Sequence, residues 1–104
     1  PNVLVIHLGT NGPASQETYD RIVAAAAGVP YILFLTVRAD RTWTADNNQR
    51  IHDLEVRYPG TVHLLDWAEV SNLCPGDCFY GDNIHLRPAG QQFYADQVWA
   101  AIGR

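Results

Sequence analysis

The sequence predicts an α/β fold in which helices cover both faces of a parallel sheet. Three short apolar runs, at residues 3–8, 31–37 and 61–65, lack the apolar–polar alternation of a strand that has one face in water. Segments with helical spacing of apolar residues separate these runs, and strands that alternate with helices form right-handed crossovers in a parallel sheet. The predicted order is strand, helix, strand, helix, strand, loop, helix.

Each predicted helix has a start signal and an apolar face. Ser15 can cap the first helix, which Gly28 and Pro30 would end, and Thr44 can cap the second. Pro88 suits the first turn of the last helix. The apolar faces consist of Tyr19, Ile22, Val23 and Ala26 in the first helix, Ile51, Leu54 and Tyr58 in the second, and Phe93, Tyr94, Val98 and Ile102 in the third.

The composition indicates one globular domain and argues against two classes of partner. Of the 104 residues, 47% are hydrophobic and 17% are charged, which excludes a disordered chain. The net charge is −4 and the seven basic residues, all Arg, are scattered along the chain. Nucleic acid and anionic membranes are therefore not expected as main partners. No apolar run approaches the roughly 20 residues of a membrane helix.

The start of the chain indicates a piece of a longer protein. The sequence begins with Pro1 and contains no Met. Residues 3–8 are also too apolar for a comfortable exposed edge strand. We therefore expect an upstream segment of the same domain to supply at least one strand beside them.

The two cysteines, Cys74 and Cys78, lie in a loop-like stretch of sequence C-P-G-D-C. The pair offers too few ligands for a metal site, and its spacing is not that of the redox C-x-x-C motif. We expect a local disulfide, which favours an extracytoplasmic location. Two free buried thiols are the alternative.

The candidate site consists of polar residues that follow the strands, because ligands bind outside the carboxyl ends of strands in open α/β sheets. Asp82 precedes His85 by three residues, so its carboxylate can bond Nδ1 and leave Nε2 as a general base. The Asn11 amide can donate to a developing oxyanion, and Gly9 allows close backbone approach. The alternatives are a surface turn with a locally bonded His and a tight Asn-Gly turn.

Weaker candidates for substrate binding lie nearby. Thr10 adjoins Asn11, and Arg38 and Arg41 can bind an anionic group, with solvated or carboxylate-paired arginines as the alternative. Trp43 and Trp67 can line a carbohydrate or acyl pocket, or belong to the core. The remaining histidines, for which a structural role is expected, are His7, His52 and His63.

Taken together, these stretches resemble the SGNH (GDSL-type) hydrolase superfamily. Residues 5–12 (VIHLGTNG) resemble its block with the oxyanion-hole Asn, and residues 82–90 (DNIHLRPAG) resemble its final block with the catalytic Asp and His. A middle series is similar to the extracytoplasmic SGNH domain fused behind membrane-bound acyltransferase-3 proteins, including peptidoglycan O-acetyltransferases. That series comprises Thr36-Val37-Arg38, Trp43, Asn48, Leu65-Asp66-Trp67 and Ser71.

The resemblance covers nearly the whole chain and implies a three-layer, flavodoxin-like fold. Residues 1–104 would be the C-terminal part of one SGNH domain, truncated to about three strands and three helices. His85 would act as base and acid, Asp82 would orient it, and Asn11 with Gly9 would form the oxyanion hole. An acyl-serine intermediate would pass its acyl group to water or to a sugar hydroxyl, without a cofactor or metal.

The family also implies partners: an acylated carbohydrate or another small ester, with membrane contact only through a fused upstream domain. The Gly-Asp-Ser block with the nucleophile is absent from this sequence, as is the Gly-bearing second block. The only serines, Ser15 and Ser71, lack the family's context. Two positions of the final block also differ from the family. Arg87 stands before the Pro, where relatives commonly have Thr or Ser, and Asn83 stands where they frequently have Gly. We therefore expect a nucleophile outside these residues and an inactive isolated chain. The alternatives are a non-catalytic module that binds a glycan or partner protein, and a complementing half of a split enzyme.

Overall fold

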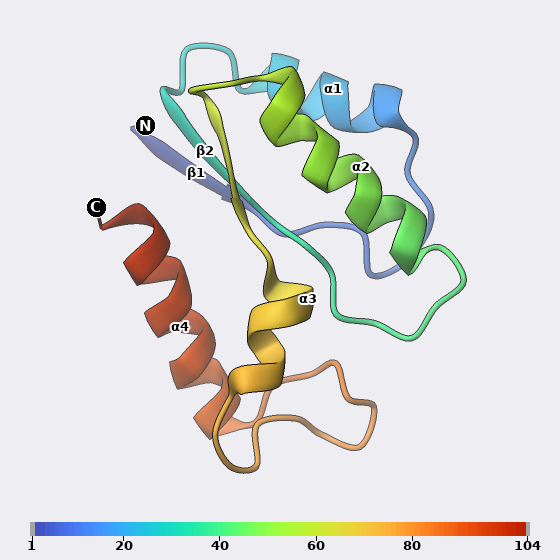
Figure 1. Ribbon diagram of the computed structural model, residues 1–104, viewed down its shortest axis with the longest axis vertical. Helices are drawn as coiled ribbons and strands as arrows, with labels where there is room; N and C mark the ends of the chain where they lie inside the picture. Colours follow the sequence, from blue (N-terminus) through green and yellow to red (C-terminus); the bar gives the residue numbers. More distant parts are fainter. Residues whose placement is uncertain (1, 104) are drawn as a thin grey trace.

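The computed structural model describes residues 2–103 and shows a three-stranded parallel sheet with helices on both faces (Figure 1). The strands β1 (Val3–Ile6), β2 (Tyr31–Leu35) and β3 (Val62–Leu65) lie side by side in that order. Ile32 of the central strand stands opposite Leu4 on one side and opposite Val62 on the other. The predicted α/β class and parallel sheet are confirmed.

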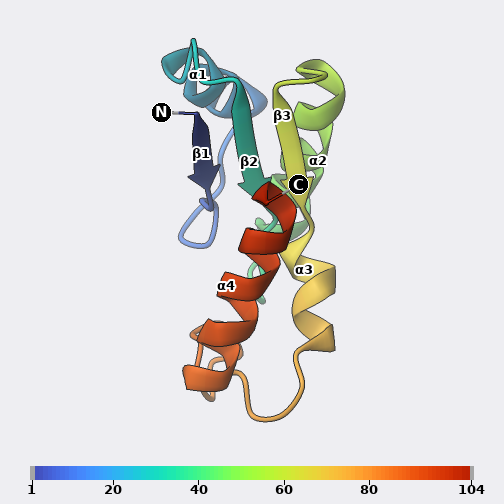
Figure 2. The same ribbon diagram turned by 90° about the vertical axis from the view of Figure 1, so that its left-hand side faces the viewer.

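Four α-helices and one 3-10 helix occur within the described residues. They are α1 (Gln16–Ala25), α2 (Thr44–Arg57), α3 (Trp67–Val70), the 3-10 helix η1 (Ser71–Leu73) and α4 (Pro88–Ile102). Figures 1 and 2 show α1 and α2 on one face of the sheet and α4 on the other. The short pair α3 and η1 continues from the end of β3.

The core is divided by the sheet into two apolar clusters. Ile32 and Phe34 of β2 face α1 and α2, and the alternate residues Leu33 and Leu35 face α4. All four are buried, which explains why β2 reads as a continuous apolar run. The first cluster also contains Tyr19, Val23, Ile51, Leu54 and Val62, and the second contains Leu65 and Trp67 with Phe93, Tyr94 and Val98 packed against them.

Two strands end earlier than their apolar runs predict. The β2 ladder stops at Leu35, although burial continues through Thr36 and Val37. At Val37 the side-chain amide of Asn48 replaces a neighbouring strand, because Val37 N donates to Asn48 Oδ1 at 2.7 Å and Asn48 Nδ2 donates to Val37 O at 2.9 Å. β1 ends at Ile6, shortly before the backbone turns at Gly9, where φ is +125°.

The predicted start signals are confirmed at α1 and α4, whereas the cap predicted for α2 is wrong. Ser15 caps α1, accepting a hydrogen bond from Thr18 N at 3.1 Å, and Pro88 lies in the first turn of α4. The N-cap of α2 is Trp43 rather than Thr44, because Asn47 N already bonds the Trp43 carbonyl at 3.0 Å. Thr44 is thus the first helical residue and its side chain does not cap the helix.

The segment between β3 and α4, predicted as a loop, contains α3 and η1 at its start. Beyond them the expected disulfide between Cys74 and Cys78 closes a short ring. Phe79 and Leu86 then form an isolated antiparallel bridge, and Arg87 N donates to Cys78 O at 2.9 Å. The chain between these two contacts is therefore a closed hairpin-like loop, and it carries the candidate His and Asp.

β1 lies at one edge of the sheet and pairs only with β2 among the described residues. Val3 and Val5 of this strand are 37% and 39% exposed, and Leu8 just beyond it is also exposed. An apolar edge with unpaired backbone groups favours pairing with a further strand.

Candidate functional site

Asp82 and His85 form a hydrogen-bonded pair in the loop that precedes α4. Asp82 Oδ2 bonds His85 Nδ1, and Asp82 Oδ1 accepts from the backbone nitrogens of Ile84 at 2.9 Å and His85 at 3.0 Å. The His85 side chain is 78% exposed. Because Asp82 holds Nδ1, Nε2 is the ring nitrogen left to exchange a proton with an external group.

These bonds hold the pKa of the Asp82 carboxyl at about 2, below its ordinary value of 3.8. The largest cause is the hydrogen bond from the His85 side chain, followed by the backbone N–H groups of Ile84 and His85. Asp82 is therefore ionised at neutral pH. An ionised carboxylate at Nδ1 favours the tautomer with its proton on Nδ1 and a lone pair on Nε2.

The backbone of the loop is shaped around this pair. Tyr80 N donates to the His85 carbonyl at 2.9 Å, and Asn83 N donates to the Tyr80 carbonyl at 2.9 Å. Asn83 has φ +62°, in the left-handed region that Asn and Gly accept most readily. This tight turn brings the Asp82 carboxylate back onto the N–H groups that follow it.

A cavity of about 460 Å³ lies beside His85. Its wall includes His7, whose Nδ1 lies 2.8 Å from the Tyr94 hydroxyl oxygen in stacked rings. Burial lowers the pKa of His7, against a backbone hydrogen bond at Thr36 that raises it. The other lining residues are Trp67, Tyr80, Ile84, Leu86 and Gln91. The exposed imidazole thus borders a partly apolar space that could hold a reacting group.

The turn after β1 is held by Asn47, which is not among the predicted site residues. Asn47 is fully buried, and its Nδ2 donates to the carbonyls of Gly9 at 3.0 Å and Gly12 at 2.8 Å. Its Oδ1 accepts from Ala14 N at 3.0 Å. Asn47 shares a helical face with the buried Ile51, so an Asn on the apolar face of α2 was the available signal.

Gly9 fits this turn for steric reasons, whereas Asn11 is exposed. A Cβ at Gly9 would lie 3.0 Å from the Tyr19 hydroxyl and 3.1 Å from Val37 Cγ2. Gly9 and Asn11 line a cavity of about 390 Å³ that shares His7 with the cavity beside His85. The two candidate groups of residues therefore border adjoining cavities.

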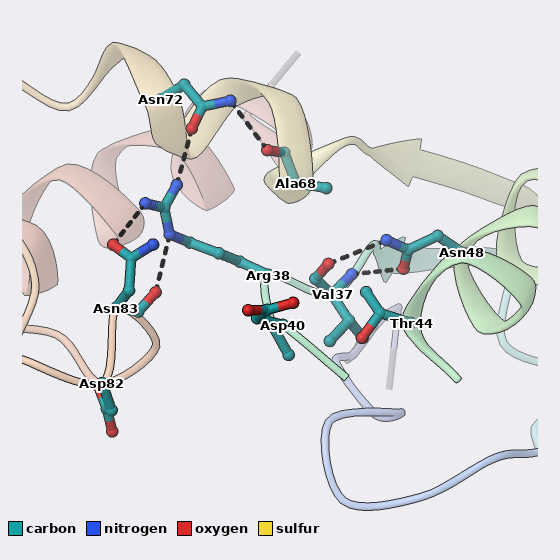
Figure 3. Close-up of a pocket in the computed structure, with 10 residues that line it drawn as sticks. Val37, Arg38, Asp40, Thr44, Asn48, Ala68, Asn72, Asp82 and Asn83 are labelled. Atoms are coloured by element: carbon teal, nitrogen blue, oxygen red, sulfur yellow. Dashed lines mark hydrogen bonds between the residues drawn. The ribbon is translucent and has the colours of Figure 1, made fainter. Parts of the chain in front are cut away.

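The weaker candidates are distributed over three places. Trp43 Nε1 donates to Thr10 O at 3.1 Å, which joins the loops after β2 and β1. The exposed Arg41 bonds the carbonyl of its neighbour Asp40 at 3.0 Å. Arg38 borders a cavity of about 330 Å³ that Asp82 also lines, and it reaches across to the Asp82–His85 loop (Figure 3).

The remaining aromatic and histidine candidates make internal contacts. Trp67 is buried in the core, as one of the two readings expected. His63 stacks on Tyr31 with ring centroids 3.8 Å apart, and His52 Nε2 lies 3.5 Å from Asp66 Oδ2.

Comparison with models of known protein families and with curated protein sequences finds no match. The fold and site define an α/β domain that presents an exposed His–Asp pair in the loop before its last helix. Within residues 2–103, no group of three or more His, Cys, Asp or Glu side chains could hold a metal ion. None of the helices in that range combines the length and the apolar character needed to cross a bilayer.

Proposed function

We propose that this chain supplies the acid–base part of an SGNH-type serine ester hydrolase or O-acyltransferase. The observation that carries the proposal is the Asp82–His85 pair, in which an ionised carboxylate holds Nδ1 of an exposed imidazole. The substrate would be an acylated carbohydrate or another small ester, and the serine nucleophile would lie outside these 104 residues.

In the proposed reaction, His85 Nε2 takes the proton of the serine hydroxyl as its oxygen attacks the ester carbonyl. The resulting imidazolium gives this proton to the departing alcohol, which leaves an acyl-serine. Water or a sugar hydroxyl then loses a proton to Nε2 and attacks the acyl group, and the proton returns to the serine oxygen. The Asn11 amide and the Gly9 N–H would donate to the oxyanion in both steps.

Three features support the resemblance to SGNH hydrolases. Asn83 stands where the family frequently has Gly, and its φ of +62° is a conformation that either residue accepts. The strand order β1-β2-β3 is compatible with the third to fifth strands of a flavodoxin-like sheet. The exposure of Val3 and Val5 suits a further strand beside β1, on which the nucleophile would arrive.

We propose an extracytoplasmic location for the domain, periplasmic, cell-wall or secreted. The Cys74–Cys78 disulfide supports this location, since disulfides persist mainly in oxidising compartments.

The test uses a fluorophosphonate probe that reacts with activated serine, followed by denaturing intact mass measurement of the protein sample. A labelled species heavier than the 104-residue chain is expected. Its label should be lost in His85→Ala and retained in the matched control His52→Ala, whose imidazole lies in α2. The isolated chain should hydrolyse an unactivated ester, such as an acetylated sugar, at the buffer rate, because an imidazole without a serine nucleophile does not cleave such esters.

Other outcomes identify the alternatives. An unlabelled sample that still binds a glycan would replace the enzyme with a non-catalytic module. A label on a small co-purifying chain would indicate a split enzyme. For a labelled protein, acetyl transfer to a sugar oligomer against acetate release to water separates transferase from hydrolase.

A further inference from the structure

We infer that Arg38 is a positioning residue for the Asp82–His85 pair, and that it acts by a hydrogen bond to the peptide group between Asn83 and Ile84. The catalytic meaning of this inference rests on the proposed function, whereas the positioning itself does not.

The guanidinium of Arg38 joins two segments that are distant in sequence. Its Nε donates to the Asn83 carbonyl at 3.0 Å, and its Nη2 donates to Asn83 Oδ1 at 2.8 Å. On the other side, Nη1 donates to Ser71 Oγ at 2.9 Å and to Asn72 Oδ1 at 2.8 Å. These four bonds, of which Figure 3 draws those to Asn72 and Asn83, occupy the guanidinium's donors almost completely.

All four acceptors of the Arg38 guanidinium are neutral oxygens. Arg38 also lies over the ring of Phe79, with Cζ 3.9 Å from the ring centroid. Phe79 belongs to the bridge that closes the loop at Leu86. Arg38 therefore contacts the loop both at its closing bridge and at its tip.

The contact at the tip connects Arg38 to the catalytic candidates. The carbonyl of Asn83 and the N–H of Ile84 belong to one peptide group. Arg38 Nε binds its oxygen at 3.0 Å, while Asp82 Oδ1 accepts from its nitrogen at 2.9 Å. A cation at the oxygen polarises the peptide and strengthens its N–H as a donor. The same Asp82 carboxylate holds His85 Nδ1, so the hydrogen bonds run without interruption from Arg38 to the imidazole.

Figure 3 shows the Asp82 side chain pointing away from the guanidinium, so the effect passes through the peptide rather than through a direct ion pair. Binding the carbonyl and the side-chain oxygen of Asn83 together requires a planar guanidinium, a fork of several N–H groups in fixed directions. Lysine has the same charge but a single ammonium group, which cannot reproduce the fork.

The test compares Arg38→Gln and Arg38→Lys with Arg41→Gln by NMR. Arg41 lies three residues further on, and its replacement removes the same charge from the same loop without touching Asn83. The readouts are the titration of the Asp82 carboxyl carbon and the nitrogen shifts of the His85 ring. Both need no substrate.

The wild-type chain should show a pKa for Asp82 of about 2. Both Arg38 variants should raise that pKa toward its ordinary value of 3.8 and mix the two ring tautomers of His85. Arg41→Gln should resemble the wild type. The inference is overturned if Arg38→Lys resembles the wild type, or if Arg41→Gln matches Arg38→Gln, because charge alone would then explain the effect.

A milder variant covers the case in which the Arg38 variants do not fold. Asn83→Gly accepts the left-handed backbone at this position and removes only the bond from Nη2 to Oδ1. Because the bond from Nε to the Asn83 carbonyl stays in place, Asn83→Gly should keep the low pKa of Asp82. A rise of the pKa to its ordinary value would show that the side-chain bond, and not the contact with the peptide group, positions the pair, and would reject the inference. The NMR test and the labelling test are independent. If the Arg38 variants change the Asp82 titration as expected but fluorophosphonate never labels the protein, the positioning role of Arg38 is kept and the proposed enzymatic function is rejected.

Discussion

Asp82 binds His85 twice, once at the backbone nitrogen and once at the imidazole Nδ1. A single carboxylate thus fixes both the main chain and the side chain of the residue three positions later. The orientation of the ring is consequently coupled to the conformation of the loop. Any change that opens the turn at Asn83 should also release the imidazole.

The first prediction concerns the protonation of Asp82 at low pH. The pKa of Asp82 is about 2 in the folded chain, and its ordinary value is 3.8. The bonds of the ionised carboxylate therefore stabilise the loop when the pH is above 3.8, and this stabilisation is lost as the pH falls through about 2. The amide signals of Ile84 and His85 should therefore shift in a transition centred near pH 2, while core signals such as that of Leu33 stay constant. Nitrogen–proton correlation spectra across this transition test the prediction. Asp82→Asn should remove the transition, and a transition centred at the ordinary value would contradict the structure.

The second prediction concerns the buried amide of Asn47. Asn47→Ala would leave the carbonyls of Gly9 and Gly12 and the N–H of Ala14 without their partner. We expect a loss of about 2–4 kcal/mol in the free energy of unfolding, measured by urea denaturation. The neighbouring exposed Asn11→Ala should change it by less than about 0.5 kcal/mol. Equal effects of the two substitutions would show that Asn47 does not hold this turn.

The third prediction compares two glycines near the site. A Cβ at Gly90 in α4 would lie 2.2 Å from the carbonyl oxygen of Cys78, which accepts the hydrogen bond from Arg87. Gly90→Ala should therefore cost about 1–3 kcal/mol of stability by pushing α4 away from the loop. Gly81→Ala meets no atom within 4 Å and should be within about 0.5 kcal/mol of the wild type. Thermal or urea unfolding of both variants decides the matter, and a neutral Gly90→Ala would refute the close packing.

The fourth prediction concerns the Cys74–Cys78 disulfide. It closes a ring of only five residues, so its removal should lower the free energy of unfolding by about 2 kcal/mol and leave the fold intact. The measurement is urea unfolding with and without reductant. The double variant Cys74→Ser and Cys78→Ser should be insensitive to reductant. Alkylation of both cysteines in untreated, unfolded protein would contradict the bond.

Local patterns predicted much of the fold. β2 reads as an apolar run because both of its faces are covered, and Ser15 caps α1 as its position before an amphipathic segment suggested. The pair α3 and η1 was missed, because four and three residues are too few to show a helical period. The start of α2 was misplaced by one residue, since its N-cap is Trp43, which makes no side-chain cap bond, and Thr44 is the first helical residue.

In the candidate site, too, contacts between residues close in sequence were predictable, and contacts between distant residues were not. Asp82 and His85 are three residues apart, so their contact could be foreseen from spacing. Asn83 is 45 positions from Arg38, and their contact depends on where β2 ends relative to the loop before α4. No local pattern carries that information.

The adjacent residues Asn47 and Asn48 have a consequence for how this sequence can change in length. Asn47 holds the turn after β1, and Asn48 completes the end of β2 at Val37. Inserting or deleting one residue ahead of them within α2 would rotate both amides by about 100° around the helix axis and lose both attachments at once. Indels should therefore be accepted in the exposed segment at residues 40–42 and rejected in the first turn of α2, even where the inserted residue is an excellent helix former.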